Sequence, residues 1–128
     1  MIRTIGLSAV LVLAGVAAAA PATAAPAAKK KTELTLSYTA EAGYAAAVVL
    51  RCDPAGGPHP KKGKACAALA KVNGNPAKLK PANTMCTMEY APITAEITGK
   101  WQGKKVKWTQ QYGNPCEMTR ATGVVLAF

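Results

Sequence analysis

The chain has 128 residues and a formal net charge of +10, from 16 Lys and Arg residues against 6 Asp and Glu residues. Half of its residues are hydrophobic, but only 5% are aromatic. This length is enough for one domain with a single modest core.

Residues 1–24 have the pattern of a secretory signal peptide. One basic residue, Arg3, precedes a short apolar run that ends in small residues, which offer a cleavage site after Ala24. A membrane anchor is the alternative, but the run is short and rich in alanine for a span of roughly 20 residues. We expect residues 25–33 to form a basic flexible arm and residues 34–128 to form the folded domain of a secreted, extracellular protein.

Two strand candidates open this predicted domain. In ELTLSYTA, every second residue from Leu34 to Tyr38 is apolar or aromatic, which is the period of a strand with one buried face. The apolar segment YAAAVVLRC, which ends at Cys52, is the second candidate. The Pro- and Gly-rich residues 53–60 then predict a loop, and this loop holds the single histidine, His59.

One helix is predicted from the pattern, over residues 61–72. Its apolar residues fall mostly at helical spacing, and Asn73-Gly74 is a typical stop signal. Asn75 is a candidate N-cap with Pro76 in the first helical position, which allows one or two further turns.

Three further strands are predicted after this helix. Residues 93–98 alternate between apolar and polar, residues 104–112 have the pattern of a partner strand, and Gly99 to Gly103 supply the turn. The apolar residues 123–128 are expected to form the last strand. The pattern predicts an α+β domain, in which a helix covers one face of an antiparallel sheet.

Four cysteines are present, and an even count in a short exported chain predicts two disulfides formed in an oxidising compartment. Spacing alone leaves three pairings open. Zinc binding is the alternative, but no C-x-x-C pair occurs and there is one histidine. We therefore expect no metal and no cofactor.

Lysines gather in three groups, at residues 29–31, 61–64 and 104–107. Such groups attract nucleic acid, an anionic polymer or an acidic protein, although a solvated basic surface is the simpler interpretation. No nucleic-acid-binding motif accompanies them, so no nucleic-acid partner is expected.

No catalytic constellation is found, and we expect the chain not to be an enzyme. His59 lies in a Pro/Gly loop, the carboxylates are scattered, and neither a phosphate-binding loop nor H-E-x-x-H occurs. Function is therefore expected in a binding surface. The best candidate is NTMCTMEYAP, Asn83–Pro92, a predicted exposed loop with Met85 and Met88 on either side of Cys86.

The cysteine-containing motifs follow a recognisable order along the chain. In chain order they are LRCDP, CAAL, MCTMEYAP, WQG, NPCEM and the closing VVLAF. Together these segments resemble the Streptomyces subtilisin inhibitor family, and the resemblance runs from Leu34 to Phe128.

The resemblance implies a secreted inhibitor of subtilisin-like serine proteases, with chymotrypsin-like proteases as a second target. It implies a five-stranded antiparallel sheet with two short helices on one face, a homodimer formed through the sheets, and no membrane in the mature form. The implied disulfides are Cys52–Cys66 and Cys86–Cys116. The implied reactive bond is Met88–Glu89.

Each side chain of this loop then has an expected role. Met88 would enter the primary specificity pocket of the protease and Met85 a second large apolar pocket, because neighbouring side chains of an extended chain point to different sides. Cys86 would point away from the enzyme and anchor the loop. Thr87 and Tyr90 complete the expected contacts.

Two positions depart from the family's best-known member, which has proline in place of Thr87 and valine in place of Glu89. Asn114 is placed to hydrogen-bond the loop from beneath, with an ordinary turn residue before Pro115 as the alternative. A competing function from another class is a secreted cationic module that binds anionic polymers.

Overall fold

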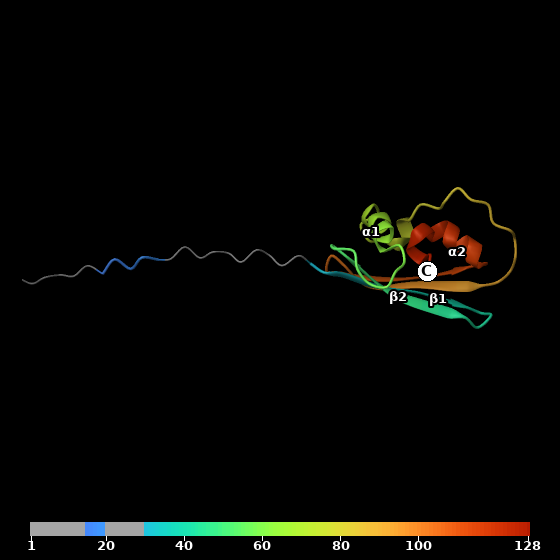
Figure 1. Cartoon of the computed structure of the whole chain (residues 1–128), viewed down its shortest axis with the longest axis horizontal. Helices are drawn as coiled ribbons and strands as arrows, with labels where there is room; N and C mark the ends of the chain where they lie inside the picture. The colour runs from blue at the N-terminus through green and yellow to red at the C-terminus, as the bar shows by residue number, and fades with distance from the viewer. Residues whose placement is uncertain (1–14, 20–29) are drawn as a thin grey trace, which may run out of the picture.

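The computed structural model describes residues 15–19 and 30–128. Most of the predicted signal peptide, 1–24, and residues 25–29 of the predicted arm lie outside the described residues. From Thr32 onward the chain forms two layers, a sheet and a group of helices on one of its faces (Figure 1). Among the described residues, no helix has the length and apolar character that crossing a membrane requires.

The sheet is antiparallel and has the strand order β2-β1-β3-β4. Hydrogen bonds pair β1 with both β2 and β3, and β3 with β4, so the two central strands come from distant parts of the sequence. The strands are β1 (Thr32–Ala40), β2 (Ala45–Cys52), β3 (Ile93–Trp101) and β4 (Lys104–Tyr112). All four match segments that were predicted as strands, β2 from a continuous apolar segment and the other three from the alternation of apolar and polar residues.

The expectation of five strands is wrong, because the sheet has four. Residues 123–128, predicted as the last strand, instead begin with the 3₁₀ helix η2 (Gly123–Leu126). Gly123 has a φ of +57° and ends the preceding helix, and Val125 and Leu126 then turn into the core. In an apolar run this short, no period separates a strand from a helical turn.

Two helices, α1 (Lys62–Ala70) and α2 (Pro115–Thr122), lie on the same face of the sheet (Figure 1). The predicted helix at residues 61–72 is confirmed as α1, and the Asn75-Pro76 signal as the short 3₁₀ helix η1 (Pro76–Lys78). The sequence pattern alone had not predicted α2, although the family resemblance implied a second helix.

The core lies between the sheet and the helices. Alternate residues of the central strands point inward and are fully buried, as Leu34, Leu36 and Ile97 show. From the helical side, Leu69 of α1 and Val125 of η2 close the core. The opposite face of the sheet, called the free face below, has no helix over it (Figure 1).

His59 is a structural residue of this core and has only 3% of its surface exposed. Its Nδ1 accepts a hydrogen bond from the Lys61 amide at 2.9 Å, which leaves Nε2 to donate to the Val125 carbonyl, also at 2.9 Å. Both ring nitrogens are thus occupied. Nearby, the disulfide Cys52–Cys66 ties the end of β2 to α1, with 5.7 Å between the two Cα atoms.

Gly74 allows the chain to turn closely after α1. Its φ is +72°, and a Cβ at this position would lie 2.1 Å from Cγ of Trp101. We expect Gly74→Ala to lower the free energy of unfolding by about 2–4 kcal/mol, because the left-handed backbone and the clash both oppose a side chain. Urea denaturation measures this change.

Gly63→Ala in α1 is the matched control for this substitution. A Cβ at Gly63 meets no atom within 4 Å, so alanine should raise the free energy of unfolding by about 0.5 kcal/mol through its higher helix propensity. Similar effects of the two substitutions would show that the close approach of Gly74 to Trp101 is not a constraint on the fold.

Candidate functional site

The segment between η1 and β3 contains the predicted loop Asn83–Pro92. The structure confirms that it is irregular and that most of it is exposed, although Pro92 at its end is buried. It arches over the helix layer and descends at one end of the sheet (Figure 1). The exposed fractions of Met85, Met88 and Tyr90 are 97%, 100% and 84%. Three large apolar side chains at full exposure in one loop indicate a contact surface.

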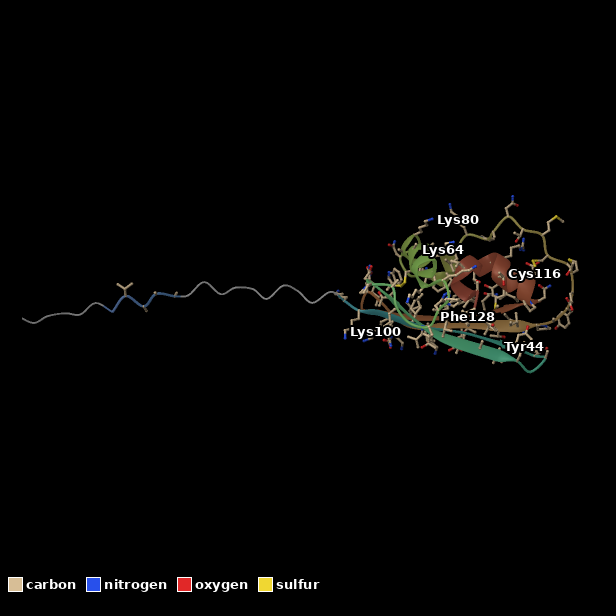
Figure 2. All side chains as sticks on the ribbon, viewed as in Figure 1. Tyr44, Lys64, Lys80, Lys100, Cys116 and Phe128 are labelled. Atoms are coloured by element: carbon tan, nitrogen blue, oxygen red, sulfur yellow. A yellow bond between two sulfur atoms is a disulfide. The ribbon has the colours of Figure 1, made fainter. Side chains whose placement is uncertain are left out.

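A disulfide joins this loop to the body of the domain. Cys86 is bonded to Cys116, the second residue of α2, with 5.7 Å between the two Cα atoms. Figure 2 labels Cys116 at the end of the molecule where the loop descends. Both disulfides therefore have the pairing that the family resemblance implied, and among the described residues no cysteine is free.

Asn114 lies beneath the loop and is 4% exposed. Its Nδ2 donates to the carbonyl of Thr87 at 3.1 Å and to the carbonyl of Glu89 at 2.8 Å. These two carbonyls belong to the residues on either side of Met88. Both N–H groups of the Asn114 side chain therefore donate to the backbone on either side of the exposed Met88.

The oxygen of the same side chain caps α2. Asn114 Oδ1 accepts a hydrogen bond from the Glu117 amide at 2.8 Å, while Pro115 occupies the first helical position. The hydrogen bonds to the loop that the sequence predicted for Asn114 are present. The alternative, an ordinary turn residue before Pro115, is wrong, because Asn114 is the N-cap of α2.

Backbone hydrogen bonds fix both ends of the loop. On one side the Ala82 amide donates to the Arg120 carbonyl at 2.7 Å, and on the other the Ala91 amide donates to the Gly113 carbonyl at 2.8 Å. Arg120 itself forms an ion pair with Glu117 across one turn of α2. The sequence offered no signal for these contacts, because backbone groups carry no residue-specific pattern.

No group of acidic, histidine or cysteine side chains that could hold a metal occurs in the part of the chain that the structure describes. Burial raises the pKa of Tyr112, at the end of β4, because it disfavours the charged phenolate.

Comparison with known proteins gives one consistent result. The family model described as subtilisin inhibitor-like matches residues 13–114. The chain is 41% identical over 98 residues to subtilisin inhibitor-like protein 1 of Streptomyces cacaoi, across 73% of this chain and 89% of that protein. It is 37% identical over 135 residues to a subtilase-type protease inhibitor of Streptomyces coelicolor, across 98% of this chain and 94% of that protein.

A solved structure shares the fold. It is Streptomyces caespitosus sermetstatin in complex with Bacillus licheniformis subtilisin, with a TM-score of 0.59 and 24% sequence identity. The match covers 76% of this chain and all of that one.

The double role of Asn114 can be separated by substitution. Asn114→Ser keeps an oxygen that caps a helix, whereas Asn114→Ala removes it, so the serine variant should be more stable by about 0.5–2 kcal/mol in urea denaturation. Alanine has no donor, and serine has a single O–H on a shorter side chain, so neither can replace the two N–H bonds to the carbonyls of Thr87 and Glu89. We therefore expect the backbone order parameter of Met88, measured by ¹⁵N relaxation, to fall in both variants toward flexible values below about 0.6. A Met88 amide that stays as ordered in both variants as in the parent would contradict this role.

Proposed function

The chain belongs to the subtilisin inhibitor-like family, and we propose that it inhibits subtilisin-like serine proteases by presenting Asn83–Pro92 as a substrate-like loop. The observation that carries this proposal is the geometry around Met88. Its side chain is 100% exposed, while hydrogen bonds from Asn114 hold the carbonyls before and after it. The reactive bond in this proposal is Met88–Glu89.

Methionine fits the primary specificity pocket of a subtilisin. It is long, unbranched and polarisable, so it fills an apolar pocket without a charge that must be desolvated. Met85, 97% exposed, would occupy a second apolar pocket. The sermetstatin structure contains a subtilisin as partner, which supports this class of target. Chymotrypsin-like proteases, whose primary pocket is also apolar, are the second class that we propose.

Preorganisation would make the complex tight. A flexible peptide loses roughly 0.5–1.5 kcal/mol for each side chain that binding immobilises. Here the Cys86–Cys116 disulfide, the Asn114 amide and the two backbone bonds at the ends of the loop impose the order before binding. Most of the ordering cost is therefore met during folding.

The same restraints would make cleavage slow. The protease serine attacks the Met88 carbonyl, the acyl-enzyme forms, and the amine of Glu89 becomes the leaving group. This amine stays near the acyl group, because the Glu89 carbonyl accepts a hydrogen bond from Asn114 and the chain continues into β3 at Ile93. Attack of the amine back on the acyl-enzyme then competes with attack by water.

We place this activity outside the cell. The pattern of residues 1–24 supports export, and two disulfides fit an oxidising compartment. We also propose a homodimer formed through the free face of the sheet. This face has no helix over it and carries small side chains such as Ala47 and Ser37, which allow a second sheet to approach.

Met88→Lys tests the reactive bond. A lysine placed in an apolar subtilisin pocket leaves its charge without a partner, so inhibition of subtilisin should weaken about 10- to 100-fold. The carboxylate of a trypsin pocket pairs with lysine, so the variant should gain inhibition of trypsin. Inhibition constants against purified subtilisin and purified trypsin measure this change of specificity.

Met85→Lys is the matched control, since it adds the same charge to the same loop at a similarly exposed position. It should weaken inhibition of subtilisin without any gain against trypsin. An unchanged profile for Met88→Lys, or a gain against trypsin from Met85→Lys, would place the reactive bond elsewhere.

Sedimentation equilibrium tests the proposed dimer. Ala47→Lys puts a charge in the free face, and its burial between two sheets should raise the dimer dissociation constant by about tenfold or more. Ala42→Lys, in the turn between β1 and β2, adds the same charge away from this face and should leave the constant unchanged. A parent chain that sediments as a monomer at micromolar concentration would refute the dimer.

A further inference from the structure

One end of the domain has acidic residues and no basic ones, although the chain as a whole has a formal net charge of +10. We call it the loop end, because the exposed loop descends there. It is formed by the β1–β2 turn, the last residues of the loop with the start of β3, and the end of β4 with the start of α2. These segments, residues 39–47, 89–96 and 109–117, contain four of the six acidic residues and neither lysine nor arginine.

We propose that a cavity at the loop end receives a lysine or arginine side chain from the target protease. This side chain would lie on the enzyme surface next to the pockets that bind the residues after the reactive bond. The inference rests on the proposed function and adds to it a preference for subtilisin-like proteases that are basic at this place.

The fold brings the three segments of the loop end together. Ala40, at the end of β1, pairs in register with Ile93, which pairs in turn with Tyr112 at the end of β4. The Glu41 amide donates to the Pro92 carbonyl at 3.0 Å, which ties the β1–β2 turn to the end of the loop. Residues that are far apart in sequence thus form one surface beside the proposed reactive bond.

Two of the four carboxylates at the loop end are free to meet a partner. Glu117 is paired with Arg120, and Glu96 points to the free face of the sheet, since its neighbours in β3 are buried on the other side. Glu41 and Glu89 are exposed, and neither belongs to an ion pair among the described residues. Glu89 is the first residue after the proposed reactive bond. A protease that binds the loop therefore approaches both of these negative charges.

A cavity of about 390 Å³ lies between the β1–β2 turn and the end of the loop. Tyr44 and Tyr90 line it together with Glu41, which is the only charged residue of its lining, and alanines and Pro92 complete the walls. Tyr90 is the second residue after the proposed reactive bond. The cavity is therefore next to the part of the loop that a protease would cover.

The cavity lies on the same side of the sheet as the loop and not on the free face. Tyr44 shows this, because it also lines a neighbouring cavity together with Met118 and Thr119 of α2. Tyr44 is 49% exposed and Tyr90 84%, so both side chains are accessible. Figure 2 shows Tyr44 at the same end of the domain as Cys116 and far from Lys100.

The chemistry of the lining favours a long cationic side chain. The apolar stem of lysine or arginine can pack on the alanines and Pro92, and its charge is attracted both by the face of a tyrosine ring and by the carboxylate of Glu41. An uncharged apolar side chain would cover Glu41 without giving it a partner. Charge complementarity therefore identifies the occupant as a basic side chain.

Three forms of Bacillus licheniformis subtilisin are the probes for this inference. They are the parent enzyme and two variants, in which one exposed neutral residue beside the pocket for Tyr90 is replaced by lysine or by glutamate. At low salt, the lysine form should have an inhibition constant about five- to tenfold lower than the glutamate form, and this ratio should shrink as salt rises, because such charges are screened.

Glu41→Gln removes the carboxylate and keeps the size of the side chain. It should reduce the ratio between the two enzyme variants by about two- to fivefold. Asp53→Asn is the matched control, since it removes the same charge at an exposed position. Asp53 follows Cys52, which pairs with Thr32 at the start of β1, so it lies about 30 Å from Glu41. The ratio should be unchanged in this control.

Tyr44→Leu tests the aromatic ring. Leucine keeps an apolar side chain in the cavity but removes the ring face, so inhibition of the lysine form should weaken about two- to fivefold while inhibition of the glutamate form stays the same. Equal losses against both forms would overturn the role of the ring.

The outcomes separate this inference from the proposed function. Equal inhibition of the lysine and glutamate forms by the parent chain would overturn the inference alone. So would a ratio that Glu41→Gln leaves unchanged, or that Glu41→Gln and Asp53→Asn reduce to the same extent. A parent chain that inhibits none of the three enzyme forms would overturn the proposed inhibition and, with it, this inference.

Discussion

The amide of Asn114 is the interaction on which the candidate site depends. It joins two backbone segments that the sheet does not hold, the start of α2 and the exposed loop. Its position is fixed in turn by the core, because Met118 on the same helix and Val125 in η2 are buried against the sheet. The conformation of the loop therefore depends on how α2 packs against the sheet. If the core loosened, we would expect the backbone at Met88 to become disordered first.

Most of the sheet could be predicted from the sequence, because its strands have one buried and one exposed face. Ile93, Ala95 and Ile97 alternate with polar residues, and the structure buries all three. The end of the chain could not be predicted in the same way. There α2 has only eight residues and gains its stability from capping and packing, and η2 is an apolar turn with no period of its own.

The candidate site, too, could be predicted from the sequence only in part. The proline, asparagine and cysteine residues of the segment Asn83–Pro92 predicted an exposed and anchored loop. The family resemblance implied the disulfide pairing. The backbone hydrogen bonds of Ala82 and Ala91 could not be predicted from the sequence, because a backbone amide has the same chemistry in every residue. The cavity of about 530 Å³ beside the β3–β4 turn could not be predicted either, because its lining residues Asn73 and Gln102 come from distant parts of the sequence.

The strand order gives the two edges of the sheet different chemistry. At one edge, β4 carries Lys105 and Lys107, and such charges repel the edge of another sheet. At the other edge, β2 runs through Ala47, Val48 and Val49 without a charge. Addition of a strand is therefore opposed more strongly at the β4 edge than at the middle of β2. Growth into a fibre needs both edges of every sheet, so the lysines of β4 protect the chain against it.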